Sequence, residues 1–472
     1  MIRKILIANR GEIAVRIVRA CAELGITSVA IYTEADRHAL HVKKADEAYH
    51  IGPDSIAGYL NIHRIVNLAV ATACDAIHPG YGFLSENADF ARACEERGIL
   101  FIGPTAEVIA RMGDKTQARQ AMMEAGIPVV PGSEGNLADV DEALALAEAI
   151  GYPVMLKATS GGGGRGIRRC DDPQALREAF PRVVSEASKA FGRAEVFLEK
   201  FIEHPRHIEV QILADHHGNV VHLFERDCSL QRRHQKLVEI APSPQLDEAQ
   251  RQRVCDYAVR AARAVGYRNA GTVEFLLDHE GNFYFMEMNT RLQVEHPVTE
   301  AITGIDIVAE QIRIAQGDPL PFSQDDIQRR GFAMEFRINA EDPKNDFLPC
   351  FGRITRYFAP GGPGTRTDGA IYTGYRIPPH YDSMCVKLIT WALDWEQLLR
   401  RSRRALKDLT VDGVRTTIPY HLEILGNEEF RSGRIDTGFV ERHPELVDYS
   451  TRRPPRELAA AIAAAIAAHQ RL

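Results

Sequence analysis

The eight cysteines of the sequence form no CxxC pair, so neither a disulfide framework nor a structural zinc site has much support. Long apolar runs are also missing. The longest, 458–468, falls short of the roughly 20 residues that cross a bilayer. The run at 5–8 is shorter than the apolar stretch of about 7–15 residues in a secretory signal. We therefore expect reduced thiols, no membrane segment and a cytoplasmic location.

Positive charge is not in excess either. The 57 Lys and Arg residues against 64 Asp and Glu residues give a net charge of -7, which argues against a protein that mainly binds nucleic acid. The 472 residues are 45% hydrophobic and 26% charged, a balance typical of globular proteins. A chain of this length suggests about three domains.

Two common nucleotide-binding motifs are absent. The opening segment KILIANRGEIAVRIVRACAELGI predicts a strand, a turn and an amphipathic helix, but only Gly11 stands where a dinucleotide fingerprint needs three glycines. The run Gly161–Gly164 is not followed by GK[ST], so it is not a Walker loop. This run is either a flexible connector or a loop whose backbone N–H groups surround a phosphate. Lys157, at the end of the apolar strand YPVMLKA, favours the phosphate loop.

The segment FYFMEMNTRLQVEH carries polar residues with a period of two, which an extended chain would place on one face. These residues are Glu287, Asn289, Arg291, Gln293 and Glu295. The preceding TVEFLLD and the turn HEGN predict a hairpin. Pairing Asp278 with Phe283 places Glu274 directly opposite Glu287. Because opposed like charges destabilise a hairpin, this register predicts Mg²⁺ between the two carboxylates, with Asn289 nearby. A solvated strand face is the alternative.

A reaction site is predicted next to these carboxylates. Arg291 offers a planar fork for a small oxyanion, and Glu295 offers a base four residues later. Arg337 in MEFRINAED is either a further cation of the site or a structural ion-pair partner. The stretches RHIEVQ and LQRRHQK contain His207, Gln231, His234 and Lys236, each of which alone would be an ordinary polar residue.

Together these segments resemble the biotin carboxylase family, a branch of the ATP-grasp enzymes, over residues 1 to about 445. The motifs are NRGEIAVRI, HPGYGFLSEN, MGDK, KATSGGGGRG, EKFIEHPRHIEVQ, ERDCSLQRRHQK, EMNTRLQVEHPVTE, RINAEDP and PPHYDSM. The resemblance implies an α/β and α+β chain. It comprises a Rossmann-like domain (1–114), an ATP-grasp domain (115–329) with a glycine-rich lid (131–203), a mixed β-rich C-terminal domain (330–445), and a linker with an Ala-rich helix (446–472).

The resemblance also implies roles for individual residues. ATP would be bound by Lys115, Lys157, Gly163, Gly164, Glu199, Lys200, His207, Gln231, His234, Glu274 and Glu287. Magnesium or manganese would be held by Glu274, Glu287 and Asn289, and bicarbonate by Lys236, Arg291, Gln293 and Val294. Glu295 would be the general base and Arg337 would stabilise the biotin enolate, with Tyr81 and Asp382 lining the biotin pocket. Phe332 and Phe336 stand where the family often has His and Cys, which changes the polarity beside Arg337.

The biotin itself is expected on another polypeptide, because the chain contains no biotin-acceptor segment of the Met-Lys-Met type. The resemblance implies a homodimer that works with a biotin carrier or a biotinylated carboxyltransferase subunit. In the tail, Leu458, Ile462 and Ile466 form one apolar stripe, which fits either a docking helix or a frayed terminus. We favour the separate-subunit form of pyruvate carboxylase, with acetyl-CoA or another acyl-CoA carboxylase as the alternative. A different ATP-grasp ligase or a non-catalytic binding protein would show no ATPase stimulated by biotin.

Overall fold

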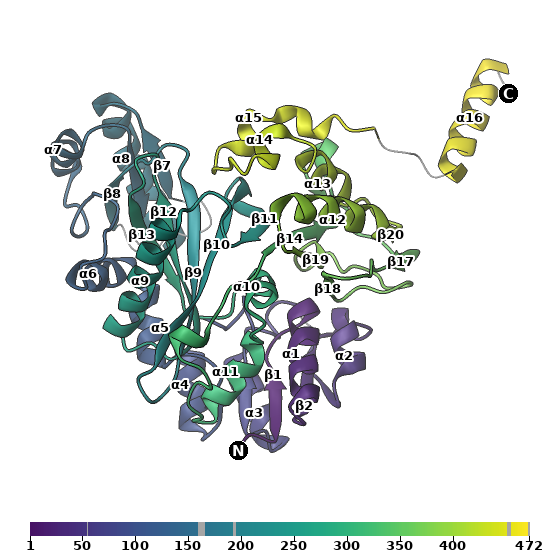
Figure 1. Cartoon of the computed structure of the whole chain (residues 1–472), viewed down its shortest axis with the longest axis horizontal. Helices are drawn as coiled ribbons and strands as arrows, with labels where there is room; N and C mark the ends of the chain where they lie inside the picture. The colour runs from purple at the N-terminus through teal and green to yellow at the C-terminus, as the bar shows by residue number, and fades with distance from the viewer. Residues whose placement is uncertain (54, 159–165, 192–194, 451–454, 471–472) are drawn as a thin grey trace.

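The computed structural model spans residues 1–472 and describes all of them except 54, 159–165, 192–194, 451–454 and 471–472. The N-terminal region forms the lower part of the molecule in Figure 1, and the strands of a long central sheet rise above it. Within the part of the chain that the structure describes, no helix is long and apolar enough to cross a membrane.

The N-terminal region is a five-stranded parallel sheet in the order β3-β2-β1-β4-β5. Its strands are β1 (Lys4–Ile7), β2 (Thr27–Tyr32), β3 (Glu47–His50), β4 (Ala76–His78) and β5 (Leu100–Phe101). Its helices are α1 (Gly11–Glu23), α2 (Leu40–Lys44), α3 (Ile62–Ala71), α4 (Ala88–Glu96) and α5 (Ala106–Gly113), with a 3-10 turn η1 (Glu34–Asp36). Ile5, Leu6 and Ile7 are fully buried, because a parallel sheet is covered on both faces. The predicted strand, turn and helix at the start of the chain are confirmed.

The next region begins with α6 (Lys115–Glu124) and continues into a small three-stranded sheet. That sheet has the order β7-β6-β8 and consists of β6 (Val154–Ala158), β7 (Ile167–Cys170) and β8 (Val196–Lys200). The helices α7 (Val140–Ile150) and α8 (Pro173–Phe191) pack against it at the upper left of Figure 1. Gly163 and Gly164, predicted to close over the phosphates, lie outside the described residues.

The central sheet has eight strands in the order β13-β12-β9-β10-β11-β14-β19-β18. Their bounds are β9 (Arg206–Ala214), β10 (Val220–Arg232), β11 (Gln235–Ala241), β12 (Asn269–Leu277), β13 (Phe283–Asn289), β14 (Phe332–Asn339), β18 (Thr365–Gly369) and β19 (Met384–Ala392). The helix α9 (Glu248–Ala264) packs on β9 and β10, and α10 (His296–Thr303) packs on β10 and β14. The pairing of β11 with β14 joins strands from both sides of residue 330 into one sheet, so side chains from both parts share one face.

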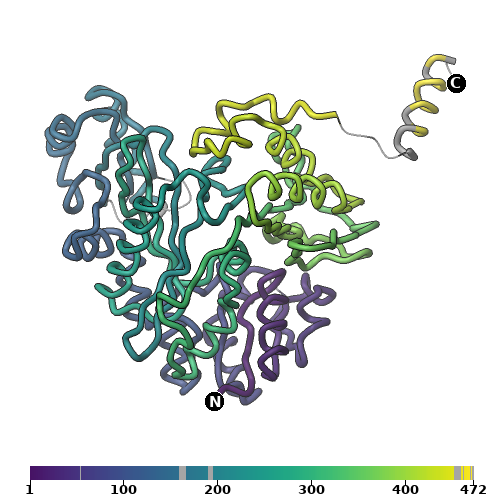
Figure 2. The backbone as a smooth tube through the Cα atoms, in the orientation of Figure 1, coloured from purple at the N-terminus to yellow at the C-terminus, as the bar shows by residue number. Residues whose placement is uncertain are grey.

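Of the remaining elements, those after residue 330 form the C-terminal part at the upper right of Figure 1, whereas the helix at 307–315 lies in the lower half. The remaining elements are α11 (Ile307–Ala315), η2 (Gln324–Asp326), β15 (Glu341–Asp342), η3 (Pro343–Asn345), β16 (Leu348–Pro349), β17 (Arg356–Phe358), α12 (Trp395–Asp408), β20 (Thr410–Asp412), α13 (Ile418–Ile424), α14 (Glu428–Arg431), α15 (Phe439–Arg442), η4 (Pro444–Val447) and α16 (Pro455–Gln470). In Figure 2, α16 lies apart from the rest of the chain. Ile462 and Ile466 of its predicted stripe are 52% and 51% exposed, whereas the side chain of Leu458 lies outside the description.

The hairpin of β12 and β13 differs from the predicted one in two respects. Glu274 does pair with Glu287, but Phe283 pairs with Leu277 instead of Asp278. An irregularity between Glu274 and Phe275 shifts the register by one residue, as a β-bulge does. The prediction that five alternating polar residues share one extended face is wrong beyond Asn289, because the strand ends there and the chain turns towards α10.

Candidate active site

Two carboxylates face each other at the end of the central sheet. The register places Glu274 on β12 opposite Glu287 on β13, as the sequence predicts. Asn289 Nδ2 donates to Glu274 Oε1 over 2.8 Å, and Gln293 Nε2 donates to the same oxygen over 2.9 Å. The opposed carboxylates supply oxygen ligands of the type that Mg²⁺ prefers, and two amides hold Glu274 in place.

These two carboxylates have different electrostatic surroundings. Burial opposes ionisation of Glu274, but Lys236 and His207 hold its pKa well below the ordinary value. Desolvation and the charge of Glu274 raise the pKa of Glu287, although its side chain is exposed to solvent. Lys115 acts in the opposite direction on Glu287, while its own pKa is lowered mainly by burial. Negative charge is therefore in excess at Glu287 on β13. A divalent cation can neutralise it.

Lys236 on β11 is the centre of a buried ion cluster. Its Nζ lies 2.6 Å from Glu209, 3.2 Å from Glu274 and 2.6 Å from Glu295. Burial lowers its pKa, but the surrounding negative charges raise that pKa well above the ordinary value, so Lys236 is a cation. One ammonium thus connects the candidate metal ligands to the candidate base.

Glu295 lies at the N-terminal end of α10, and its side chain is almost completely buried. Its Oε2 accepts a hydrogen bond of 3.0 Å from Arg337 Nη2 on β14. Burial raises its pKa, yet Lys236, Arg337 and Arg226 hold it well below the ordinary value. Glu295 is therefore an ionised carboxylate. It can accept a proton from a substrate that binds to Lys236 and Arg337 beside it or displaces them from it.

Arg291 is held in place beside this carboxylate cluster. Its Nε donates to Glu86 over 2.8 Å, and its Nη2 donates to Asn289 Oδ1 over 3.0 Å. Its Nη1 points towards the Gln293 amide oxygen at 3.4 Å. The backbone carbonyl of Val294 accepts a 2.7 Å hydrogen bond from Lys387. Arg291, Gln293 and the neighbouring Lys236 together offer several donors to a small oxyanion.

The predicted residues at the edge of the small sheet are also paired. Lys157 Nζ lies 2.5 Å from Glu199, which also lies 3.7 Å from Arg119. Lys200 donates to the carbonyl oxygens of Gly151 and Tyr152 over 2.9 and 3.0 Å. Lys200 therefore stabilises the turn at Gly151 and Tyr152. Lys157 is a cation that pairs with the carboxylate of Glu199.

His207 and Gln231 lie within the central sheet, but His234 does not. His207 Nε2 is 2.8 Å from Glu274, and its Nδ1 is 2.8 Å from Gln231 Nε2. His234 is exposed in the turn between β10 and β11, where its φ is 64°. His207, Glu209 and Glu274 have ligand atoms close enough together to hold a metal ion.

The residues predicted for the biotin pocket are brought together only in part. Tyr81 donates its hydroxyl to the buried carboxylate of Glu12, and both Glu335 and Arg337 influence its pKa. Asp382 is exposed and accepts a 2.7 Å hydrogen bond from the Met384 amide in its own turn. The structure thus places Tyr81 near Arg337, while the contacts of Asp382 are local.

Sequence reasoning missed several charged residues beneath this site: Glu12, Glu86, Glu209, Arg226, Glu239 and Lys387. Arg226 is fully buried and donates to Glu209 over 2.5 Å. Burial raises the pKa of Glu239 to about 7, and Arg337 donates to this carboxylate over 2.6 Å. Glu209 was detectable, because it alternates with His207 in RHIEVQ. Glu239 had no such signal, since its partner Arg337 lies 98 residues later in the sequence.

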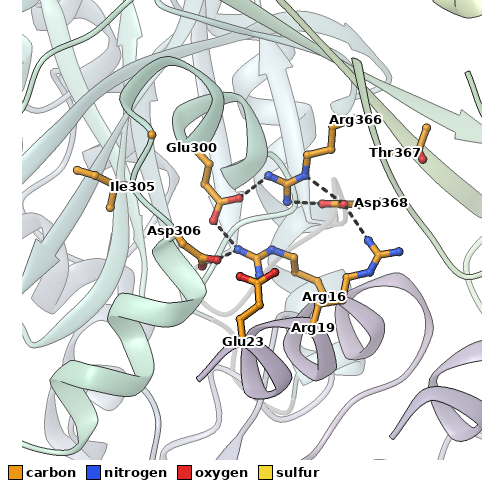
Figure 3. A pocket seen from close by; sticks show the side chains of 10 residues that line it. Arg16, Arg19, Glu23, Glu300, Ile305, Asp306, Arg366, Thr367 and Asp368 are labelled. Atoms are coloured by element: carbon orange, nitrogen blue, oxygen red, sulfur yellow. Dashed lines mark hydrogen bonds and ion pairs between the residues drawn. The ribbon is translucent and has the colours of Figure 1, made fainter. Parts of the chain in front are cut away.

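A separate pocket of about 350 Å³ lies between α1, the start of α11 and β18 (Figure 3). Arg16 is 2.8 Å from Glu300 and 2.6 Å from Asp306, and Arg366 is 2.7 Å from Glu300 and 2.6 Å from Asp368. None of the predicted site residues that the structure describes lines it. Its ion pairs tie the N-terminal helix to the C-terminal strands.

Comparisons with known proteins give a consistent set of similarities. The biotin carboxylase N-terminal domain matches residues 1–109. The carbamoyl-phosphate synthase L chain ATP-binding domain matches residues 114–323, and the biotin carboxylase C-terminal domain matches residues 335–442.

Among curated proteins, the chain is 54% identical to the 2-oxoglutarate carboxylase small subunit of Hydrogenobacter thermophilus over 472 residues, which is 100% of both chains. It is 54% identical to biotin carboxylase 1 of Bacillus subtilis over 445 residues, 94% of this chain and 99% of that protein. It is 52% identical to a pyruvate carboxylase subunit of Methanothermobacter thermautotrophicus over 97% of this chain and 93% of that protein.

Two solved structures are similar over nearly the whole chain. One is the biotin carboxylase domain dimer of the Hydrogenobacter thermophilus 2-oxoglutarate carboxylase with MgADP, ADP and bicarbonate (TM-score 0.92, 55% identity, 96% of this chain and 100% of that one). The other is the biotin carboxylase subunit of a pyruvate carboxylase (TM-score 0.84, 56% identity, 96% of this chain and 100% of that one).

Proposed function

The chain belongs to the biotin carboxylase family, and on that premise we propose that it is the biotin carboxylase subunit of a pyruvate carboxylase. It is an ATP-dependent ligase, the biotin carboxylase of a multi-subunit carboxylase. It uses MgATP and bicarbonate to carboxylate biotin carried on a separate polypeptide. The proposal extends to a homodimer in the cytoplasm.

The main support for the proposed reaction is the connected cluster of Lys236, Glu274, Glu295 and Arg337. Glu295 lies within 3.0 Å of both Lys236 and Arg337, so one carboxylate borders the candidate metal ligands and a cation on β14. The opposed Glu274 and Glu287 fit Mg²⁺, with Asn289 near them. The metal would neutralise charge on the ATP phosphates and help to align them.

The proposed reaction begins with deprotonation of bicarbonate. Arg291, Gln293 and Lys236 hold the anion against Glu295, which takes its proton. A bicarbonate oxygen then attacks the γ-phosphorus of ATP, ADP leaves, and carboxyphosphate forms. Carboxyphosphate breaks down to CO2 and phosphate, and the phosphate takes the proton of the biotin ureido nitrogen. Arg337 stabilises the resulting enolate, which captures CO2.

The nucleotide is assigned to a set of residues of which two, Gly163 and Gly164, lie outside the described part of the chain. They are Lys115, Lys157, Gly163, Gly164, Glu199, Lys200, His207, Gln231 and His234, together with Glu274 and Glu287. The contact between Lys157 and Glu199 supports this assignment, because a lysine paired with a carboxylate in the described part of the chain can turn to a phosphate. Tyr81, Arg337 and Asp382 are assigned to biotin.

The C-terminal tail supports a 2-oxo acid as the final acceptor. The 2-oxoglutarate carboxylase small subunit matches the chain from end to end, while the match to the Bacillus subtilis biotin carboxylase leaves 27 residues over. The family matches begin at residue 1 and end at residue 442, so the tail lies outside them. Its helix α16 has Ile462 and Ile466 exposed, which suits docking on a carboxyltransferase subunit.

Two assays test the proposal at its two levels. Bicarbonate-dependent ATPase activity stimulated by free biotin tests the biotin carboxylase, and its absence would refute that function. Mixing the chain with biotinylated carboxyltransferase subunits tests the acceptor, with pyruvate, 2-oxoglutarate and acetyl-CoA offered in parallel. Oxaloacetate formed from pyruvate is the expected product. Malonyl-CoA alone, from acetyl-CoA, would establish the second candidate, the subunit of an acetyl-CoA carboxylase.

A further inference from the structure

Lys387 is a charged residue in an unusual position. It lies on β19, and its side chain is fully buried. Burying an ammonium costs several kcal/mol unless charges and hydrogen bonds compensate. Its neighbours on β19 include Cys385, Val386, Leu388 and Ile389, all of them buried hydrophobic residues. A lysine in this setting calls for specific partners.

The partners of Lys387 come from three distant parts of the chain. Its Nζ donates to the backbone carbonyl of Val294 over 2.7 Å and lies 3.1 Å from Glu12 on α1. The same Nζ lies 6.0 Å from the centre of the Tyr81 ring, within range of a cation–π interaction. Glu12 in turn accepts the hydroxyl hydrogen bond of Tyr81. The Lys387 ammonium therefore links Val294, the residue before Glu295, to Tyr81, the residue assigned to biotin.

Lys387 is also aligned with the guanidinium of the site. The antiparallel register of β14 and β19 pairs Arg337 directly with Lys387, so both side chains project from the same face of the sheet. Arg337 reaches the Glu295 carboxylate, while Lys387 reaches the carbonyl of the peptide bond that leads into Glu295. The side chain and the backbone of the candidate base are thus held by two adjacent strands.

The charge of Lys387 persists in this environment. Burial lowers its pKa, but Glu12, Glu335 and Asp368 raise it above the ordinary value. Asp368 is itself paired with Arg366 at 2.6 Å, and among the described residues the ion pair of Lys387 is with Glu12.

We propose that Lys387 is a positioning residue that fixes the Val294–Glu295 peptide against Glu12 and Tyr81, and so couples the bicarbonate subsite to the biotin subsite. The inference rests on the proposed function. It assigns Lys387 no contact with substrate. Without it, the Val294 carbonyl loses its donor, and the direction of the Glu295 side chain is less constrained.

The test compares Lys387→Met with the wild type in assays of bicarbonate-dependent ATPase and of carboxylation of free biotin. Methionine keeps a linear side chain and removes only the ammonium. We expect KM for bicarbonate to rise about tenfold and kcat to fall about tenfold, while KM for ATP changes less than about twofold. A larger share of ATP cleavage should also occur without carboxylation of biotin.

Two further variants separate positioning from simple loss of stability. Thr390→Val, on the same strand, removes the buried 2.7 Å contact with Ser402 and should lower stability without changing either KM. Glu12→Gln keeps an acceptor for Tyr81 but removes the counter-charge of Lys387, so KM for bicarbonate should rise by about threefold. Glu12→Gln still tests the proposal if Lys387→Met does not fold.

The outcomes distinguish this inference from the proposed function. If the wild type shows no biotin-stimulated activity, the function itself fails. If the wild type is active and the folded Lys387→Met and Glu12→Gln variants keep the wild-type KM for bicarbonate, Lys387 has only a structural role and the inference is refuted.

Discussion

Glu274 and Glu287 lie directly opposite each other on β12 and β13, yet surrounding charges shift their pKa values in opposite directions. Lys236 and His207 keep Glu274 ionised, whereas the exposed Glu287 faces that negative charge. The hairpin therefore holds two like charges at the position where the proposed metal would bind.

The first prediction concerns this pair. Replacing Glu287 with Gln should raise the free energy of unfolding of the metal-free protein by about 0.5 kcal/mol, because it removes an opposed like charge. The same change should increase the Mg²⁺ concentration needed for half-maximal ATPase activity by about tenfold. Denaturation and Mg²⁺ titration measure the two effects, with Glu280→Gln at the exposed tip of the hairpin as the control. An unchanged Mg²⁺ requirement would remove Glu287 from the metal site.

The second prediction concerns the candidate base. Glu295→Gln should lower kcat by a factor of about a hundred or more, because the amide retains the shape of the carboxylate but cannot accept the proton. Nucleotide affinity, measured by calorimetry, should change less than about threefold. Turnover near that of the wild type would show that another group takes the proton.

The third prediction concerns pH. Burial lowers the pKa of His421 from 6.5 to about 4, and its Nε2 lies 2.9 Å from the Arg337 carbonyl. Below pH 6.5 the unfolded chain therefore takes up a proton that the folded chain resists, so this residue costs stability as the pH falls. Between pH 7.5 and pH 5, the free-energy advantage of the wild type over His421→Gln should shrink by about 2 kcal/mol.

Denaturant unfolding at the two pH values measures this difference. His279→Gln, on the exposed turn between β12 and β13, is the matched control and should show the pH dependence of the wild type. A constant difference between the wild type and His421→Gln at both pH values would contradict the assignment of a buried neutral imidazole.

The fourth prediction concerns the tail. A chain truncated after residue 450 should carboxylate free biotin at the wild-type rate, because α16 lies apart from the site (Figure 1). Carboxylation of the acceptor by the complex reconstituted with a carboxyltransferase subunit should fall at least about tenfold, through loss of docking. The full-length double variant Ile462→Asp, Ile466→Asp should reproduce this loss. If the truncated chain and the double variant both assemble normally, the tail is a frayed terminus and has no docking role.

The sequence by itself determined the family, the reaction class and most of the candidate site, because these depend on local patterns. The opposition of Glu274 and Glu287 follows from one hairpin, whose short turn limits the possible registers. The first strand, turn and helix follow from apolar periodicity around Gly11. The same local reasoning failed at the bulge beside Glu274, because one inserted residue leaves no mark on the alternation of polar and apolar side chains.

Only the tertiary structure decided which charges compensate one another within the site. Lys387 stands in an apolar strand and reaches Glu12, which is 375 residues earlier in the chain, and Val294, whose side chain gives no hint of its carbonyl's role. Glu239 likewise meets Arg337 only through the pairing of β11 with β14. Buried charges depend on neighbours within a few ångströms, and in a sheet those neighbours are set by non-local strand pairing that no local sequence pattern encodes.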